Sequence, residues 1–344
     1  MLVLAEKILV TGGAGFIGSH TTLTLLEAGL DVVVLDNLCN SSVIALRRIE
    51  TICGKAPIFI EGDIRDSRLL DNLFNEHHIS AVLHFAGLKA VGESVRAPLN
   101  YYDNNFVGSI SLFQAMARAG VYHLVFSSSA TVYGEPKQMP ISEDFPTGIP
   151  TNPYGRSKLM VEDALRDLSV SDPLWSIGLL RYFNPVGAHE SGIIGEDPNG
   201  IPNNLLPYVS QVAIGKLKYL SVFGTDYPTP DGTGIRDYIH VQDLADGHLS
   251  ALQKVLQTKG VNIWNLGTGV GYSVLEIIRA FEQASGRAVP YQMVERRPGD
   301  IAQCWAAPQK AADELGWRAK RGLLEMMADT WRWQMGNPQG YGSQ

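Results

Sequence analysis

The sequence predicts an α/β protein in which a doubly wound parallel sheet is followed by a smaller C-terminal α/β domain. Strand-like and helix-like runs alternate along roughly the first 185 residues, as they do when crossover helices connect parallel strands. A glycine-rich turn separates the first strand-like run from the first helix-like run. After Asn184 and Pro185 the alternation stops, and stretches rich in turn-forming residues follow. We therefore expect one domain at 1–185, with a return segment around 236–266, and a second domain formed mainly by 186–344.

The strands and helices of this fold can be assigned in order from the apolar pattern. Strands are predicted at 7–11, 31–36, 57–61, 81–86, 124–126, 176–180 and 263–266. Helices are predicted at 19–28, 69–77, 112–119, 158–168, 205–214 and 241–252. Ligands of open parallel sheets bind beyond the carboxyl ends of the strands, so residues directly after these strands are the first candidates for a site.

Composition excludes several classes of function. Apolar content of 45% and charged content of 18% are ordinary for a globular enzyme, and the net charge of -7 argues against nucleic acid or an anionic membrane as a partner. The three cysteines form no C-x-x-C pair and no closed disulfide set, which predicts a reducing compartment and no metal site. The N-terminal residues do not resemble a signal peptide, and no run of 18 apolar residues occurs. We expect a cytoplasmic protein.

The turn after the first strand carries the spacing of a dinucleotide-binding loop. Gly12, Gly15 and Gly18 permit a tight turn and a close approach to a pyrophosphate, and the following helix offers its positive N-terminus. The second strand ends at Asp36, eighteen residues after Gly18, where an acid can accept hydrogen bonds from a ribose. The order of strand, glycines, helix, strand and acid indicates a Rossmann domain that prefers NAD to NADP. The alternative is a glycine-rich loop that binds nothing.

Tyr154 and Lys158 are the candidate proton-transfer pair. If the helix already covers Tyr154, the two side chains lie one turn apart on the same face. A nearby cation lowers the pKa of a phenol from its usual value of about 10, so Tyr154 could act as base or acid with Lys158 as its tuner. Such a pair is also common on helix surfaces. Ser129 ends a strand ahead of this pair and could bind Tyr154 or a substrate hydroxyl, whereas Ser127 and Ser128 are expected to form a polar turn.

The second half of the chain offers two candidate phosphate-binding arginines. Arg236 follows a turn-rich stretch, and Arg297 lies in a loop with a second arginine and Asp300. Guanidinium groups bind phosphates in a bidentate manner, so the two could clamp an anionic substrate. Solvated surface arginines are the alternative.

Taken together, these motifs resemble the extended short-chain dehydrogenase/reductases. The resemblance rests on the blocks 11–18, 36–37, 62–64, 84–89 and 127–134 and on Tyr154-x-x-x-Lys158. Further blocks at 89–94, 101–105, 181–188, 202–204 and 234–240 resemble the UDP-glucose 4-epimerase family. The resemblance extends from about Lys7 to the tail at 338–341, which is nearly the whole chain.

The resemblance implies residues for each role. It implies that Tyr154, Lys158 and Ser129 are catalytic. It implies an NAD groove in the first domain made by Gly12, Gly15, Phe16, Ile17, Gly18, Asp36, Asn37, Leu38, Cys39, Asn40, Ser41, Asp63, Ile64, Phe85, Ala86, Gly87, Leu88, Lys89, Asn104, Ser129, Tyr154, Lys158 and Phe183. It implies a UDP-sugar site, mainly in the second domain, made by Ser129, Tyr154, Asn184, Asn204, Ser221, Val222, Phe223, Arg236, Arg297, Asp300 and Cys304.

The implied activity is reversible 4-epimerisation of UDP-glucose and UDP-galactose through a 4-keto intermediate, by a homodimer with tightly held NAD. The alternatives are a nucleotide-sugar dehydratase of the same fold, which would need an Asp-Glu pair where this chain has Ala130 and Thr131, and a non-catalytic NAD-sensing binding protein. In the resembled family the position of Cys304 faces the sugar, and a small residue there leaves room for an N-acetyl group. UDP-GlcNAc and UDP-GalNAc are therefore possible further substrates, unless Cys304 is an ordinary packed residue.

Overall fold

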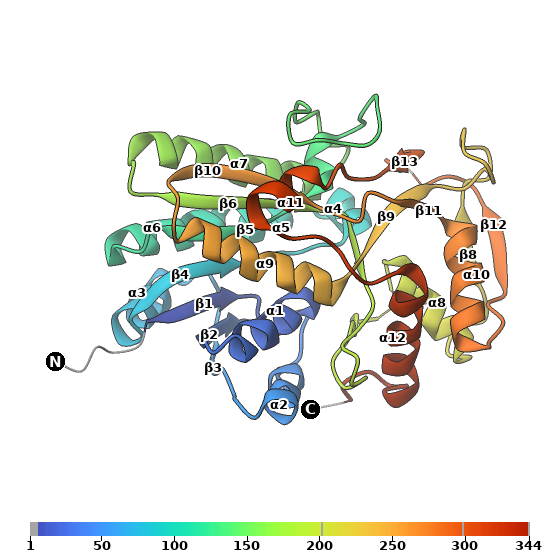
Figure 1. The fold of residues 1–344 in the computed structure, drawn as a ribbon, viewed down its shortest axis with the longest axis horizontal. Coiled ribbons are helices and arrows are strands. Elements are labelled where there is room, and N and C mark those ends of the chain that lie inside the picture. Colours follow the sequence, from blue (N-terminus) through green and yellow to red (C-terminus); the bar gives the residue numbers. More distant parts are fainter. Residues whose placement is uncertain (1–5, 201, 298, 343–344) are drawn as a thin grey trace.

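A seven-stranded parallel sheet, the main sheet, forms the centre of the protein (Figure 1). The computed structural model describes residues 6–342 except 201 and 298. The N-terminal residues 1–5, and positions 201 and 298 in loops predicted from the sequence, therefore lie outside the described residues. The strand order is β10-β6-β5-β4-β1-β2-β3, and every neighbouring pair is parallel. The strands are β1 (Lys7–Thr11), β2 (Asp31–Asp36), β3 (Ile58–Glu61), β4 (Ile79–His84), β5 (His123–Ser129), β6 (Ser176–Tyr182) and β10 (Gly260–Leu266).

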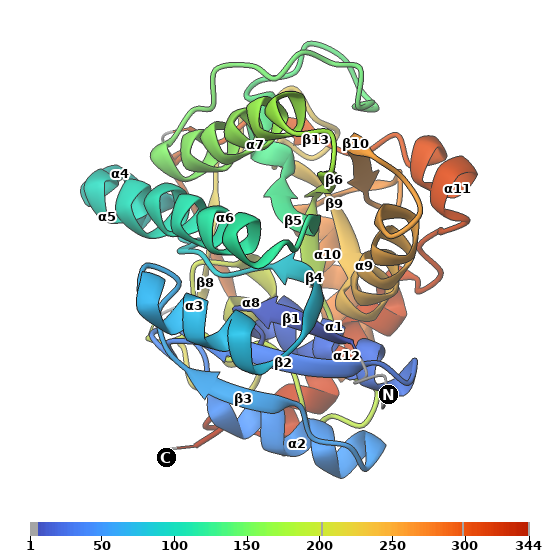
Figure 2. The same cartoon turned by 90° about the vertical axis from the view of Figure 1, so that its left-hand side faces the viewer.

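Helices cover both faces of the main sheet. The helices of this part of the protein are α1 (Phe16–Glu27), α2 (Val43–Cys53), α3 (Ser67–Glu76), α4 (Val91–Arg96), α5 (Pro98–Tyr101), the π-helix η1 (Tyr102–Val107), α6 (Gly108–Ala119), the 3-10 helix η2 (Ala130–Tyr133), α7 (Pro153–Ser171), α9 (Val241–Val255) and α11 (Gln309–Leu315). Leu23 of α1 and Leu252 of α9 are buried in one apolar core, and Leu112 of α6 and Leu165 of α7 in another. Figure 2 shows the sheet between these two layers. The doubly wound α/β fold is therefore confirmed.

The strand order reverses between β1 and β4. From β1 the chain moves outward to β2 and β3, then crosses to β4 and moves the other way. The crevice at such a reversal is where open α/β sheets bind their ligands. The glycine-rich loop follows β1 and the Phe85–Lys89 loop follows β4, so both border this crevice.

A second group of elements, called the second lobe below, lies to the right of the main sheet in Figure 1. It consists of β7 (Asn184–Val186), α8 (Leu205–Ala213), β8 (Leu220–Phe223), β9 (Ile235–His240), β11 (Gly271–Ser273), α10 (Val274–Ser285), β12 (Tyr291–Val294), β13 (Gln303–Cys304) and α12 (Leu323–Gly336). Its own core includes Val209, Ile277, Phe281 and Met327. Between its strands β9 and β11 the chain returns to the main sheet through α9 and β10.

Candidate active site

A cavity of about 1020 Å³ lies between the carboxyl end of the main sheet and the second lobe. Glycine-rich loop residues line one part of it, and Arg236 and Arg297 line another. Tyr154, Lys158 and Ser129 line it as well. The structure therefore brings residues from widely separated parts of the sequence around one cavity. The volume of this cavity is at the upper end of the range usual for ligand sites.

The glycine-rich loop has a shape that only glycine permits at two positions. Gly12 has a φ of +72°, and a Cβ there would lie 2.6 Å from the backbone nitrogen of Ala86. A Cβ on Gly18 would lie 2.2 Å from the carbonyl oxygen of Gly12. Helix α1 begins directly after Gly15, which has no side chain to cap the first N–H groups of the helix. These N–H groups stand at the cavity wall and form a site for an anion such as a pyrophosphate.

Asp36 at the end of β2 organises the neighbouring loop. Its carboxylate accepts hydrogen bonds from the backbone nitrogens of Ala14 (3.0 Å) and Leu38 (2.9 Å) and from the hydroxyl of Ser41 (2.8 Å). It is 8% exposed and lines the cavity. Two carboxylate oxygens provide about four acceptor positions, so Asp36 can hold this loop and still accept a ribose hydroxyl.

The loop after β4 is held by a buried asparagine in the π-helix η1. The Asn105 side chain accepts a bond from the Leu88 nitrogen (2.7 Å), donates to the Leu88 oxygen (3.0 Å) and donates to the Ser157 hydroxyl (3.1 Å). It therefore connects the loop that lines the cavity to helix α7. The extra residue of a π-turn changes which side chains face inward, and such turns are frequent at functional sites. Asn104, its neighbour in η1, lines the cavity.

Helix α7 begins at Pro153, five residues before the predicted start. The Asn152 side chain caps it by accepting a bond from the Gly155 nitrogen (2.9 Å), and Pro153 suits the first helical position. Tyr154 and Lys158 therefore lie within the helix, one turn apart. The buried Lys158 ammonium donates to the Ser127 carbonyl oxygen at 2.7 Å and lies 4.9 Å from the centre of the Phe126 ring.

The electrostatics of this pair differ from the sequence-based expectation. Burial raises the pKa of Tyr154, and its hydrogen bond with Ser129 lowers it only in part. Burial also lowers the pKa of Lys158 to about 8. The expectation that Lys158 lowers the pKa of Tyr154 is thus wrong for this structure, because the ammonium is bonded to Ser127 and its own charge is disfavoured by burial.

The strand end at 127–129 does more than form a polar turn. The Ser129 hydroxyl accepts bonds from the nitrogen (3.2 Å) and hydroxyl (3.0 Å) of Thr131 and lines the cavity beside Tyr154. Ser128 donates to the buried carboxylate of Glu162, which pairs with Arg181. The expectation that Ser127 and Ser128 form a polar turn is therefore wrong: both belong to strand β5, where Ser127 lines the cavity and accepts the bond from Lys158, and Ser128 bonds to Glu162.

The two candidate arginines lie at the second-lobe side of the cavity. Arg236 is on β9, between β11 and β13, and its guanidinium donates to the Ile235 oxygen at 2.8 Å. Arg297 pairs with Asp300 at 2.9 Å and lies 4.8 Å from the centre of the Phe223 ring. A guanidinium group has five N–H donors, and these contacts use only some of them on each arginine. Both arginines therefore remain able to bind phosphate.

Cys304 lies on β13 at the inner wall of the cavity. It packs in a small apolar cluster with Ala130 and Phe183 and is 9% exposed. Burial raises the pKa of its thiol to about 12, so it stays protonated and acts as a small apolar surface.

Among the site residues predicted from the sequence, Leu38, Asp63 and Val222 do not line the cavity, and the others do. Asp63 accepts a bond from Asn37 at 3.0 Å and pairs with Arg65, so it supports the wall from behind. The Val222 side chain is fully buried in the core of the second lobe. Sequence reasoning named neither Glu196, which lines the cavity, nor Asn105, which acts through its neighbours.

His84 is a packed core histidine, buried between the hydroxyls of Thr11 (2.7 Å) and Ser109 (2.9 Å). Over residues 6–342, with 201 and 298 left aside, no helix is long and apolar enough to cross a membrane. The same residues contain no cluster of three or more His, Cys, Asp or Glu side chains that could hold a metal ion.

Comparison with known proteins agrees with this geometry. Residues 9–330 match the family model described as GDP-mannose 4,6 dehydratase. The UDP-glucose 4-epimerase of Bacillus subtilis is 64% identical over 98% of this chain and 99% of its own length. The UDP-glucose 4-epimerase of Bifidobacterium longum, solved with NAD+ and UDP, is 56% identical with a TM-score of 0.95, covering 97% of this chain and 100% of that one. That of Stenotrophomonas maltophila, solved with NAD and formylated UDP-arabinopyranose, is 52% identical with a TM-score of 0.95, covering 97% and 99%. The chain belongs to the nucleotide-sugar branch of the extended short-chain dehydrogenase/reductases and, within it, to the UDP-glucose 4-epimerase family.

Proposed function

We propose that this protein interconverts UDP-glucose and UDP-galactose at C4 of the sugar, with NAD as a resident cofactor. The observation that carries the proposal is the position of Tyr154, Lys158 and Ser129. They stand on the wall of one cavity that has an uncapped helix N-terminus in one part and two arginines in another. A dinucleotide and a nucleotide sugar can therefore meet at these three residues. The names of the relatives at 64% and 56% identity support the same activity.

The residues fit NAD by the chemistry of the groove. The N–H groups at the start of α1 suit the pyrophosphate, and Asp36 suits a ribose and disfavours a 2′-phosphate. When bound, NAD would supply a reversible hydride acceptor and donor for C4 of the sugar. Because no net oxidation occurs, the cofactor has no reason to leave between turnovers.

Tyr154 is the residue proposed to carry the proton. It takes the proton from the 4-hydroxyl as the 4-keto sugar forms and returns it after the sugar has turned over. Ser129 hydrogen-bonds Tyr154 and is placed to bond the same hydroxyl. Lys158 supplies positive charge beside the cofactor ribose. Burial raises the pKa of Tyr154, so its transfer role depends on positive charge that arrives with the bound cofactor.

The two parts of the fold would divide the binding. We assign NAD to the main-sheet part, residues 1–185 with α9 and β10 as the return segment, and the UDP-sugar mainly to residues 186–344. Arg236, Arg297 and Asn204 would hold the nucleotide diphosphate, which leaves the sugar free to turn. The free thiols Cys39, Cys53 and Cys304 support a reducing location such as the cytoplasm.

The dehydratase alternative lacks its acid. Ala130 and Thr131 line the cavity at the position where elimination would need an Asp-Glu pair. A non-catalytic NAD-binding protein has no requirement for Tyr154 or Lys158, both of which line the cavity. To test the proposal, the pure protein is denatured, released NAD is assayed, and conversion of UDP-galactose to UDP-glucose is followed. Released NAD without conversion would favour the binding-protein alternative, and a 4-keto-6-deoxy product would favour the dehydratase.

We further propose that the sugar end of the cavity accepts an N-acetyl group. Cys304 lines the cavity next to Ala130, which is equally small, so no bulky side chain from β13 occupies that wall. The Cys304→Tyr variant would add a ring there and should abolish conversion of UDP-GlcNAc to UDP-GalNAc while sparing UDP-galactose. Cys53→Ser, a change at a thiol on α2 away from this wall, is the control. Absence of N-acetyl conversion by the unmodified protein would contradict the proposal.

A further inference from the structure

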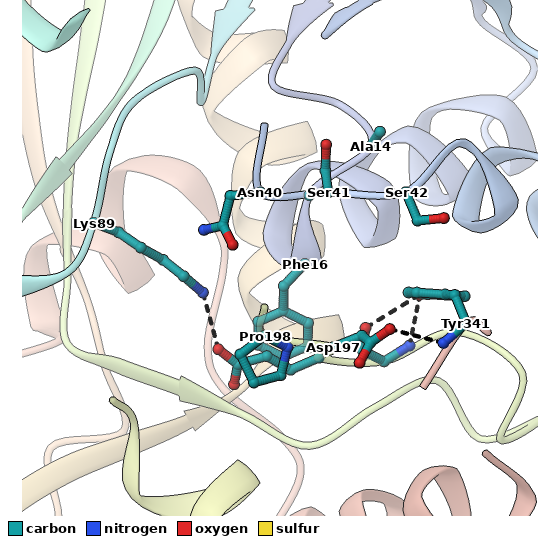
Figure 3. A pocket seen from close by; sticks show the side chains of 12 residues that line it. Ala14, Phe16, Asn40, Ser41, Ser42, Lys89, Asp197, Pro198 and Tyr341 are labelled. Carbon is teal, nitrogen blue, oxygen red and sulfur yellow. Dashed lines mark hydrogen bonds and ion pairs between the residues drawn. The ribbon is translucent and has the colours of Figure 1, made fainter. Parts of the chain in front are cut away.

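The C-terminal tail, residues 337–341, holds a segment that passes over the cofactor side of the cavity. This segment, residues 195–199, is called the clasp. Glu196 of the clasp lines the main cavity, together with Gly15, Phe16 and Lys89. The same four residues also line a small adjoining hollow, whose wall includes Asp197 and Tyr341. Figure 3 shows this hollow, with Lys89 reaching in from one side of Phe16 and Tyr341 on the other.

Three successive clasp residues are each fixed from the C-terminal end of the chain. The Tyr341 hydroxyl donates to the Gly195 oxygen (3.1 Å) and accepts from the Gly195 nitrogen (3.2 Å). The Trp333 indole donates to the Glu196 oxygen (3.1 Å). The Tyr341 backbone nitrogen donates to the Asp197 carboxylate (2.7 Å). Backbone groups of Gly195 and Glu196 and the side chain of Asp197 are thus all bonded to the C-terminal end of the chain, and these bonds hold the clasp in place.

The tail itself is anchored to the main-sheet side of the cavity. Arg48 of α2 donates to the Asn337 side chain at 2.6 Å, and its guanidinium lies 5.0 Å from the centre of the Tyr341 ring and 5.7 Å from that of Trp333. Tyr341 is 9% exposed. The tail thus joins the clasp to the helix that follows the Asp36 loop.

The glycines on both sides make the close packing possible. Gly340 has a φ of +70°, and a Cβ there would lie 2.1 Å from the Asp197 carboxylate. A Cβ on Gly195 would lie 2.5 Å from the Trp333 ring. The two glycines therefore allow the clasp to pack closely against the tail, at Gly340, and against helix α12, at Gly195.

The clasp also bonds to the walls of the cofactor groove. The Glu196 carboxylate accepts bonds from Lys89 (2.9 Å) and from Asn204 (2.8 Å). Asn199 donates to the Cys39 oxygen at 3.3 Å. The clasp therefore spans from the loop after β2 to the loop after β4, the two loops that flank the glycine-rich loop.

We propose that the tail and the clasp act together to retain NAD, with Tyr341 as a positioning residue that keeps the clasp closed over the start of α1. The inference rests on the proposed function, because only an enzyme that returns a hydride to the same sugar needs its cofactor to outlast each turnover. The clasp has to move for the dinucleotide to leave, and the bonds of Tyr341 have to break when it moves. Retention is therefore set in part by a residue that lies more than 320 positions along the chain from the glycine-rich loop that it protects.

The test measures release of NAD from the purified holoenzyme after dilution, with a dehydrogenase present that consumes free NAD. Tyr341→Phe removes the hydroxyl and keeps the ring, so its NAD should leave roughly tenfold faster, the change that corresponds to about 1.4 kcal/mol. Asp197→Asn should act in the same direction. The activity that Tyr341→Phe loses on dilution should be recovered when NAD is added. The control is Tyr122→Phe, beside Trp175 at the opposite end of the sheet, which should release NAD at the wild-type rate.

A second measurement separates retention from general stability. The gain in melting temperature that NAD gives should be smaller in Tyr341→Phe than in the unmodified protein. Wild-type release rates and an unchanged gain in melting temperature in both Tyr341→Phe and Asp197→Asn would overturn the inference while leaving the proposed function intact. An unmodified protein that neither contains nor takes up NAD would overturn both.

Discussion

The roles proposed for Tyr154 and Lys158 differ, so substitution can distinguish them. Tyr154→Phe removes the proton carrier but no charge, so turnover should fall roughly 100-fold or more while bound NAD remains. Lys158→Met removes a cation from the cofactor side of the cavity and should reduce both turnover and NAD retention. Turnover and NAD content of the two purified variants are compared with the unmodified protein. Turnover by Tyr154→Phe within a few-fold of normal would contradict the proton-carrier role.

The buried ammonium of Lys158 also predicts a pH dependence of stability. Burial lowers its pKa from 10.5 to about 8. Between these two pH values the unfolded chain holds a proton that the folded protein has released, so this group makes the free energy of unfolding rise with pH. The rise should reach about 3 kcal/mol across the window. This rise in unfolding free energy should be absent from Lys158→Met. The unfolding free energies of both proteins are therefore measured with urea, without cofactor, at pH 7.5 and at pH 10, and the difference between the two pH dependences gives the contribution of Lys158. Parallel pH profiles would show that the ammonium is not held in this environment.

Single residues also show where prediction from sequence stops. The glycine spacing, Asp36, Tyr154, Lys158 and Ser129 were identifiable because their chemistry depends on nearby sequence. The hydrogen-bond partner of Lys158 was not identifiable from the sequence, because the Ser127 carbonyl approaches the Lys158 ammonium only once β5 and α7 are packed together. The predicted direction of the Tyr154 pKa shift is wrong for the same reason. Burial of the phenol is a property of the assembled cavity, and it raises the pKa more than neighbouring groups lower it.

At the scale of the element, the π-helix η1 connects the cavity wall to α7 through Asn105. Asn105→Ala would leave the Leu88 nitrogen and oxygen without their partner in a partly buried place, so the protein should lose about 1–3 kcal/mol of unfolding free energy. The loop that lines the cofactor groove should loosen, and NAD should bind more weakly. Asn100→Ala, on the exposed side of α5, is the matched control and should stay within about 0.5 kcal/mol of the unmodified protein. Equal stability and NAD affinity in the two variants would contradict the role given to Asn105.

Elements were predictable to the extent that their signals are local. Strands β1 and β2 have the predicted boundaries because each is a continuous apolar run with a polar residue or turn at its end. The strands β7, β11 and β13 have two or three residues each and are defined by pairing with β9, which no local pattern reveals. Helix α2 was missed although Ser42 caps its start and Gly54 ends it in a left-handed conformation, so its signals were present in the sequence.

At the scale of the whole molecule, we expect a homodimer. Val95, Leu99 and Val107, at 61%, 77% and 47% exposure, place apolar side chains on the run from α4 to η1. A second copy of the chain would remove this surface from water. Sedimentation at micromolar concentration should give twice the 37.5 kDa chain mass. Leu99→Asp should give monomers, whereas Val270→Asp, on the second lobe, should not. A monomeric unmodified protein would contradict the expectation.

The position of β10 also bears on synthesis of the chain. Strand β6 ends at Tyr182 and its partner β10 begins at Gly260, with the first four elements of the second lobe (β7, α8, β8 and β9) and then α9 between them. At about 5–20 residues per second, roughly 4–16 s pass between the translation of one and of the other. During that interval the nascent sheet carries an open edge at β6, the kind of edge that pairs with other chains. Newly made chains should therefore be most prone to aggregation, and most dependent on chaperones, between the emergence of β6 from the ribosome and that of β10.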